Sequence, residues 1–231
     1  MDQQAALEYL NDYVNDPKIV ALADVSAADR ALLPQSWQHI LSVEGPERLQ
    51  RTIAAWGDFQ AEFAQTIEFL KAYLAGVELI HHDGAYSLLY GLPKPSSGKM
   101  RYYEARNPKL KKLKPEVEAA WPKFPEGLRR FYEQFHNGWY HLSSEAMGPL
   151  PAERIFPLSS MSWGILETIG PQPIDLKSTY AIFFNGSDTY LSIELKADNV
   201  HTLLWSTQEA PTYNLDFWPV LDSWTLIGLD V

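Results

Sequence analysis

Apolar side chains recur at helical spacing through the first 75 residues of the chain. Four of them share one face of a predicted first helix, which Pro17 interrupts. These four are Leu7, Leu10, Tyr13 and Val14. A longer helix is predicted from Pro46, which a first turn tolerates, to Gly76. Its apolar stripe consists of Ile53, Trp56, Phe59, Phe63, Ile67, Leu70 and Leu74. A stripe this wide must pack against another part of the protein.

Beyond residue 76 the pattern becomes extended. Asp83-Gly84 lies between apolar, strand-prone flanks and predicts a β-hairpin. Proline, serine and glycine then cluster at residues 93–99. We therefore predict a mainly helical N-terminal region, residues 1–95, followed by a second domain, residues 96–231. The first region either forms a separate helical domain or shares one core with the second, and the apolar stripe favours the shared core.

Helical spacing returns before Asn137-Gly138 and stops there. Four apolar residues form one buried stripe of this helix, namely Leu128, Phe131, Tyr132 and Phe135. Glycine readily adopts the left-handed conformation that closes a helix, so Asn137-Gly138 predicts the helix end. Residues 139–142 are extended, and the sequence GPLP at residues 148–151 predicts a turn.

The last third of the chain reads as strands and one helix. Two strands flank a turn at residues 185–188, whose Asn, Gly and Asp favour positive φ and local hydrogen bonds. Asp198-Asn199 predicts the turn into a third strand, and a C-terminal helix is predicted from Asp216, its N-cap.

Charge is unevenly distributed over the 231 residues, whose net charge is −10. Residues 1–93 carry five basic and thirteen acidic side chains, residues 94–130 carry eleven and four, and residues 131–231 carry three and twelve. Most of this surface repels nucleic acid and attracts a basic protein, although acidity also serves solubility alone. Four lysines at 109, 111, 112 and 114 are typical of a solvated basic face rather than a nucleic-acid patch.

The amino-acid composition argues against several classes of protein. Cysteine is absent, which excludes disulfides, thiolate metal sites and a cysteine nucleophile. The acidic N-terminus lacks the apolar segment of a signal peptide, and no apolar run reaches the roughly 18 residues of a membrane span. We expect a cytoplasmic protein.

Few side chains suggest chemistry. His81 and His82 precede Asp83, but neighbouring strand residues point to opposite faces, so surface histidines at a hairpin tip are expected rather than a metal site. The helix C-terminus explains His136, and His141 is expected to be an ordinary half-buried ring. Nucleophile-elbow and phosphate-loop motifs are missing. We expect no enzyme activity, no cofactor and no small-molecule ligand.

Four segments, in order, resemble the SMI1/KNR4 domain, also called the SUKH superfamily. They are FPEGLRRFYEQFHNGW at 124–139, GPLPAERIFPL at 148–158, FFNGSDTYLSIEL at 183–195 and FWPVLDSWTLIG at 217–228. The resemblance covers roughly residues 110–231, about half of the chain. It implies an α+β fold with a curved, mostly antiparallel sheet and helices packed on one side.

The resemblance also implies a function. Many bacterial members of the family are immunity proteins that bind and neutralise a toxin used in bacterial competition, whereas fungal members regulate cell-wall synthesis. We therefore expect an immunity protein that occludes a basic cognate toxin. A regulatory scaffold is the first alternative, and an enzyme using His136 or His141 is the second.

Contact with such a toxin would involve carboxylates and an aromatic anchor. Carboxylates near strand ends could substitute for the phosphates of a nucleic-acid substrate in a basic groove. The candidates are Glu145, Asp188, Glu194 and Asp198. Most tryptophans are expected in the core, but Trp163 lies in a turn-rich segment and is a candidate exposed anchor.

Overall fold

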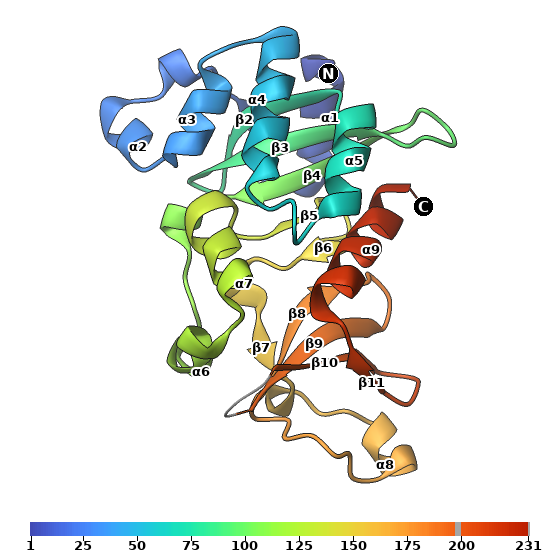
Figure 1. Cartoon of the computed structure of the whole chain (residues 1–231). Coiled ribbons are helices and arrows are strands. Elements are labelled where there is room, and N and C mark those ends of the chain that lie inside the picture. The colour runs from blue at the N-terminus through green and yellow to red at the C-terminus, as the bar shows by residue number, and fades with distance from the viewer. Residues whose placement is uncertain (197–199, 231) are drawn as a thin grey trace.

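A computed structural model describes residues 1–196 and 200–230 and shows an α+β fold with two antiparallel sheets. The first sheet has the order β1-β2-β3-β4-β5 and lies in the upper half of Figure 1. Its strands are Lys18–Ile19, Gly76–His82, Ala85–Pro93, Met100–Arg106 and Trp139–His141. The predicted α+β class is therefore confirmed, with the strands divided between two sheets.

The second sheet fills the lower half of Figure 1 in the order β11-β10-β9-β8-β6, and β7 also pairs with β8. Its strands are β6 Gly148–Pro149, β7 Phe156–Pro157, β8 Thr179–Phe184, β9 Thr189–Leu195, β10 Val200–Ser206 and β11 Thr212–Leu215. The predicted hairpin around residues 185–188 joins β8 to β9. Asn185 Oδ1 accepts the backbone N–H groups of residues 187, 188 and 189 at 2.9, 3.1 and 3.0 Å, which closes the turn.

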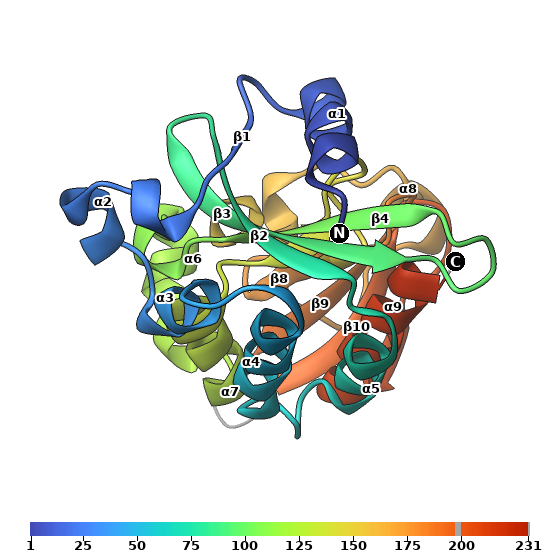
Figure 2. The same ribbon diagram turned by 90° about the horizontal axis from the view of Figure 1, so that it is seen from above.

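Helices cover both faces of the first sheet but are unevenly shared. The α-helices of the described residues are α1 Gln3–Tyr13, α2 Ala27–Ala31, α3 Gln35–Leu41, α4 Gly45–Gly57, α5 Ala64–Tyr73, α6 Pro115–Ala120, α7 Glu126–Arg130, α8 Ile165–Ile169 and α9 Phe217–Asp230, of which only some lie on the first sheet. Figure 2 shows α1 on one side of β2–β4 and α3, α4 and α5 on the other. α1, from the predicted helical N-terminal region, thus lies on the face of this sheet opposite α3, α4 and α5 (Figure 2).

The long helix predicted from Pro46 to Gly76 is two helices. α4 ends at Gly57 and α5 begins at Ala64. No side chain at the N-cap position of α5 bonds its free N–H groups. The buried Asp222 of α9 accepts them instead, from Gln65 N at 2.7 Å and Thr66 N at 2.9 Å. A cap supplied from another part of the chain cannot be read from local spacing.

The hairpin predicted at Asp83-Gly84 is confirmed. Both turn residues have positive φ, 49° and 76°, and His82 pairs with Ala85 on either side of them. β3 then pairs along its length with β4, from Ser87 opposite Arg106 to Pro93 opposite Met100. The division proposed at residues 95/96 falls in the connection between these two paired strands.

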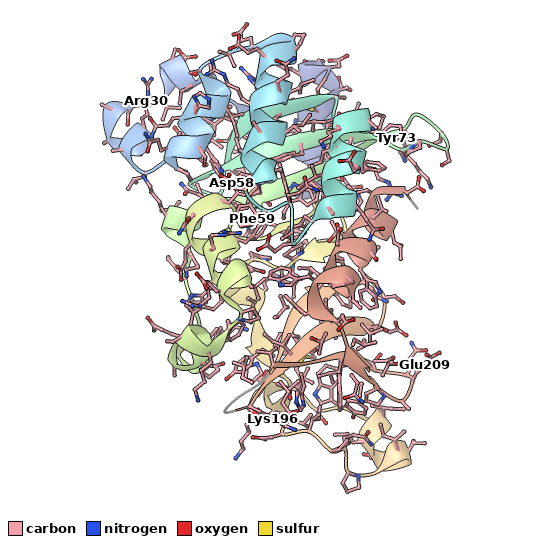
Figure 3. All side chains as sticks on the ribbon, viewed as in Figure 1. Arg30, Asp58, Phe59, Tyr73, Lys196 and Glu209 are labelled. Atoms are coloured by element: carbon pink, nitrogen blue, oxygen red, sulfur yellow. The ribbon has the colours of Figure 1, made fainter. Side chains whose placement is uncertain are left out.

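One hydrophobic core joins the two proposed regions. Trp56 of α4 lies 4.8 Å from Trp139 of β5 and 5.2 Å from Phe135, between ring centroids. Figure 3 labels Phe59 where the end of α4 meets the segment after α7, and the Arg130 guanidinium lies 4.8 Å from that ring. The apolar stripe of α4 and α5 is thus buried against the second half of the chain, as the shared-core alternative expected.

The helix predicted to end at Asn137-Gly138 ends two residues earlier, at Phe135. α7 continues as a π-helical turn over Phe131–Phe135, and His136 is already extended. Gly138 has φ 80°, and a Cβ there would lie 2.6 Å from Pro151 N. Glycine is required here because the 150–151 backbone passes directly beside it.

Candidate functional site

The face of the first sheet on which α1 packs changes from apolar to charged along its strands (Figure 2). Side chains alternate between faces, so Ile80, Leu89 and Tyr102 share this face with His82, Ser87 and Glu104. The helix α1 covers the apolar part through Ala6 and Leu10. The charged part lies outside the patch that these two residues cover.

A pocket of about 440 Å³ opens over this charged part. Its lining includes His82, Ser87, Glu104, Arg106, Lys112 and Glu153. These residues come from β2, β3, β4, the segment after β4 and the segment after β6. The site therefore exists only once the two halves of the chain have come together.

Glu104 is the centre of the charged group, and only 2% of its surface is exposed. Its Oε1 lies 2.8 Å from His82 Nε2, and its Oε2 accepts the Tyr140 hydroxyl at 2.5 Å. Arg106 Nε lies 3.7 Å from the same Oε2. Burial would raise the pKa of Glu104, but His82 and Arg106 outweigh it and lower the pKa to about 2.

His82 bridges two carboxylates. Its Nδ1 lies 3.0 Å from Asp83 Oδ2, on the side of the ring opposite Glu104. Burial would lower the pKa of His82, but the hydrogen bonds and charges of Glu104 and Asp83 raise it above its ordinary value. The prediction of surface histidines at the hairpin tip is wrong for His82, which is 5% exposed, because it turns toward Glu104.

A second ion pair connects the pocket to the Asn137-Gly138 turn. Arg106 Nη1 donates to Glu153 Oε1 at 2.5 Å, and Asn137 Nδ2 donates to Glu153 Oε2 at 3.1 Å. Asn137 Oδ1 accepts the backbone N–H of Ala152 at 2.8 Å. The asparagine predicted to end a helix therefore positions an acidic residue of the pocket.

The acidic and basic side chains of the pocket form hydrogen bonds and ion pairs with one another. Both oxygens of Glu104 and both ring nitrogens of His82 have partners within the protein. In the described parts of the chain, no group of three or more such side chains is arranged so that it could hold a metal ion.

His136 lies in the core rather than at an exposed helix end. It is fully buried, with Trp37 Nε1 3.2 Å from its Nδ1 and the Tyr90 hydroxyl 2.8 Å from its Nε2. The same indole N–H also donates to the carbonyl oxygen of Phe135 at 3.0 Å. Burial lowers the pKa of His136 to about 3, and burial together with Arg101 lowers that of the half-buried His141 to about 4.

We predict that stability falls as the pH is lowered from about 6.5 toward 3. The pKa of His136 is about 3 in the folded chain and about 6.5 in the unfolded chain. The unfolded chain therefore binds the proton more tightly between these values, which removes about 1.4 kcal/mol of stability per pH unit.

Urea unfolding at pH 7 and pH 5 measures this effect. His136→Gln should lose less stability between the two pH values than the wild type. His39→Gln, at an exposed position, should retain the wild-type loss. Equal losses in all three proteins would contradict the assignment to His136.

The residues predicted to contact a toxin differ in exposure and in their hydrogen-bond partners. Glu145 is exposed and pairs with Arg154 at 3.0 Å. Asp188 is half-buried, and its Oδ1 accepts the Thr189 hydroxyl at 2.8 Å. The two segments meet, since a Cβ at Gly186 would lie 3.3 Å from the Cβ of Ala146.

The other candidates do not form an exposed group with these two. Glu194 is 1% exposed and accepts the Asp175 N–H at 3.0 Å. Trp163 is 5% exposed, donates to the carbonyl of Leu158 at 2.6 Å and packs against Trp205, so it is not an exposed anchor. Asp198 lies outside the described residues.

Three of the four lysines in the basic segment serve the fold. Lys109 donates to the carbonyls of Ala31 and Leu33 at 3.0 and 2.9 Å. Lys111 lies 4.3 Å from the centroid of the Trp121 ring, and Lys114 lies 5.7 Å from that of Phe156. Lys112 differs, because it lines the pocket.

Sequence reasoning missed Glu104, Arg106, Tyr140 and Glu153. One signal was present: Glu104 interrupts the strand-prone run Tyr102-Tyr103-Glu104-Ala105, where a carboxylate requires a buried partner. No spacing rule relates residue 82 to residues 104 and 140, since the sheet alone makes them neighbours.

No protein-family model, no curated protein and no solved structure matches this chain. None of the helices within residues 1–196 and 200–230 combines the length and apolarity needed to cross a bilayer.

Proposed function

We propose that this chain is a cytoplasmic immunity-type protein that binds a cognate toxin one to one and neutralises it by occluding the active site. The proposal rests on the resemblance to SMI1/KNR4 domains. The observation that carries it is that the four resembling segments, separate in sequence, pack into one unit around tightly enclosed glycines.

Three contacts define that unit. Gly138 of the first segment lies against Pro151 of the second, and β6 of the second pairs with β8, at the start of the third. In the fourth segment, a Cβ at Gly228 would lie 2.6 Å from the Cβ of Met147, next to β6. Gly138 and Gly228, each within a segment that resembles the family, are thus close-packed here, which supports membership.

The edge formed by Glu145 and the 185–188 turn is the surface we propose for toxin contact. Glu145 has 58% of its side chain exposed and is held by Arg154. Two half-buried rings, Phe184 and Tyr190, stack at 4.7 Å between centroids beside this edge. Aromatic area bordered by carboxylates suits a basic protein surface.

Co-expression tests the function itself. The product of the adjacent gene should be toxic alone, harmless with this chain, and should co-purify with it in equal amounts. Toxicity that persists in the presence of the folded chain would refute the immunity proposal. A non-toxic neighbour that still co-purifies would instead favour the regulatory scaffold.

We predict that Glu145→Lys weakens the complex about tenfold, equivalent to about 1.4 kcal/mol, because it reverses a charge facing a basic partner. Binding kinetics at low and high salt should show the loss mainly in the association rate at low salt. Glu167→Lys is the matched control, in α8 at the bottom of Figure 1, away from this edge. Equal effects of both substitutions would move the contact surface elsewhere.

A further inference from the structure

The carboxylates of the pocket have no oxygen left without a partner. Asp83 Oδ1 accepts Asn15 Nδ2 at 3.2 Å, and Asp83 Oδ2 faces His82. Glu153 is held by Arg106 and Asn137, and Glu104 by His82 and Tyr140. A ligand therefore finds few free acceptors on this wall.

The groups that remain free are donors. Arg106 uses Nη1 on Glu153, and 33% of its side chain is exposed. Within the same described residues, Lys112 has neither an ion pair nor a hydrogen bond. The Ser87 hydroxyl, on a residue only 3% exposed, also has no partner among them.

The charged side chains around the pocket limit the negative charge of a ligand that can bind there. With His82 as an imidazolium, three cations (His82, Arg106, Lys112) face three carboxylates (Asp83, Glu104, Glu153). Five of these six groups are paired with one another, and Lys112 is the cation left over. These six formal charges sum to zero. A monoanion that pairs with Lys112 leaves the site at −1, whereas a dianion would leave it at −2 and is repelled more strongly by the carboxylates.

The rim supplies an apolar contact. Leu110 lines the pocket and is 40% exposed. A volume of about 440 Å³ is within the range of small-molecule sites. The ligand that fits carries one anionic group and an apolar body that covers Leu110.

We propose that this pocket binds a small organic monocarboxylate, with the carboxylate between Arg106, Lys112 and the Ser87 hydroxyl and the apolar body against Leu110. Arginine suits this role because its guanidinium keeps donors free in the plane after pairing with Glu153. The inference is independent of the toxin proposal and replaces the expectation that no small molecule binds.

Benzoate is the probe, titrated into the full-length protein and followed by amide NMR. Amides of residues 82–87 and 104–112 should shift with a saturable dependence on benzoate. Benzyl alcohol, which has the ring without the charge, and inorganic phosphate, a dianion near neutral pH, should bind at least tenfold more weakly. Absence of saturable shifts, or equal binding of all three compounds, would overturn the proposal.

Two variants test the contacts. Lys112→Ala should weaken benzoate binding about five- to tenfold, and Ser87→Ala a few-fold, without loss of folded signal. Lys123→Ala removes an exposed lysine that does not line the pocket and should leave the affinity unchanged. If Lys112→Ala binds benzoate as tightly as Lys123→Ala does, the assignment of the carboxylate position is wrong.

Discussion

Replacement of Glu104 by alanine is expected to reduce the free energy of unfolding by about 3–5 kcal/mol. The substitution leaves the Tyr140 hydroxyl buried without its acceptor and leaves His82 with Asp83 alone. Arg106 loses the more distant of its two carboxylate partners, 3.7 Å away, and keeps Glu153. Urea denaturation at pH 7 measures the change.

Two further substitutions calibrate this result. Tyr140→Phe removes one donor to Glu104 and should cost about 1–3 kcal/mol. Glu116→Ala, at an exposed position in α6, should stay within about 0.5 kcal/mol of the wild type. A Glu104→Ala protein as stable as Glu116→Ala would show that the buried network contributes nothing to folding.

Replacement of Trp56 by alanine is expected to cost about 3–5 kcal/mol, the range for an aromatic ring lost from a packed core. Trp56 is fully buried, and its ring contacts Phe63, Phe135 and Trp139. Its indole N–H also approaches the Tyr90 hydroxyl at 3.4 Å. The contacts cross from the N-terminal helices to β5, so both halves should be destabilised together.

Calorimetry and denaturation followed by two probes test this coupling. Wild type and Trp56→Ala should each unfold in one cooperative transition, with the variant shifted to lower temperature. Trp56→Phe, which keeps a smaller ring, should lose less stability. Two separated transitions, with only one of them shifted, would show that residues 1–95 fold apart from the rest.

Local pattern was sufficient where a residue's role depends on its immediate neighbours. Asp83-Gly84 specifies a tight turn through its positive φ angles, and Asn185 closes its own turn through one side-chain oxygen. The buried stripe from Leu128 to Phe135 follows from helical periodicity, and all four of its residues are buried. β4 was missed because its aromatic and charged residues do not alternate, and β11 because its alternation extends over only four residues.

The sequence by itself determined the two hairpins, the C-terminal helix and the acidic character, because each follows from short-range spacing or composition, whereas the α+β class was expected from the resemblance to SMI1/KNR4 domains. Tertiary structure alone decided that α4 and α5 separate, that Asp222 caps α5, and that His82, Glu104 and Arg106 form one pocket. The physical reason is that these features depend on partners supplied across the sheets or from a distant helix. A buried charge is stable only beside such a partner, and periodicity along the chain does not reveal which residue that partner is.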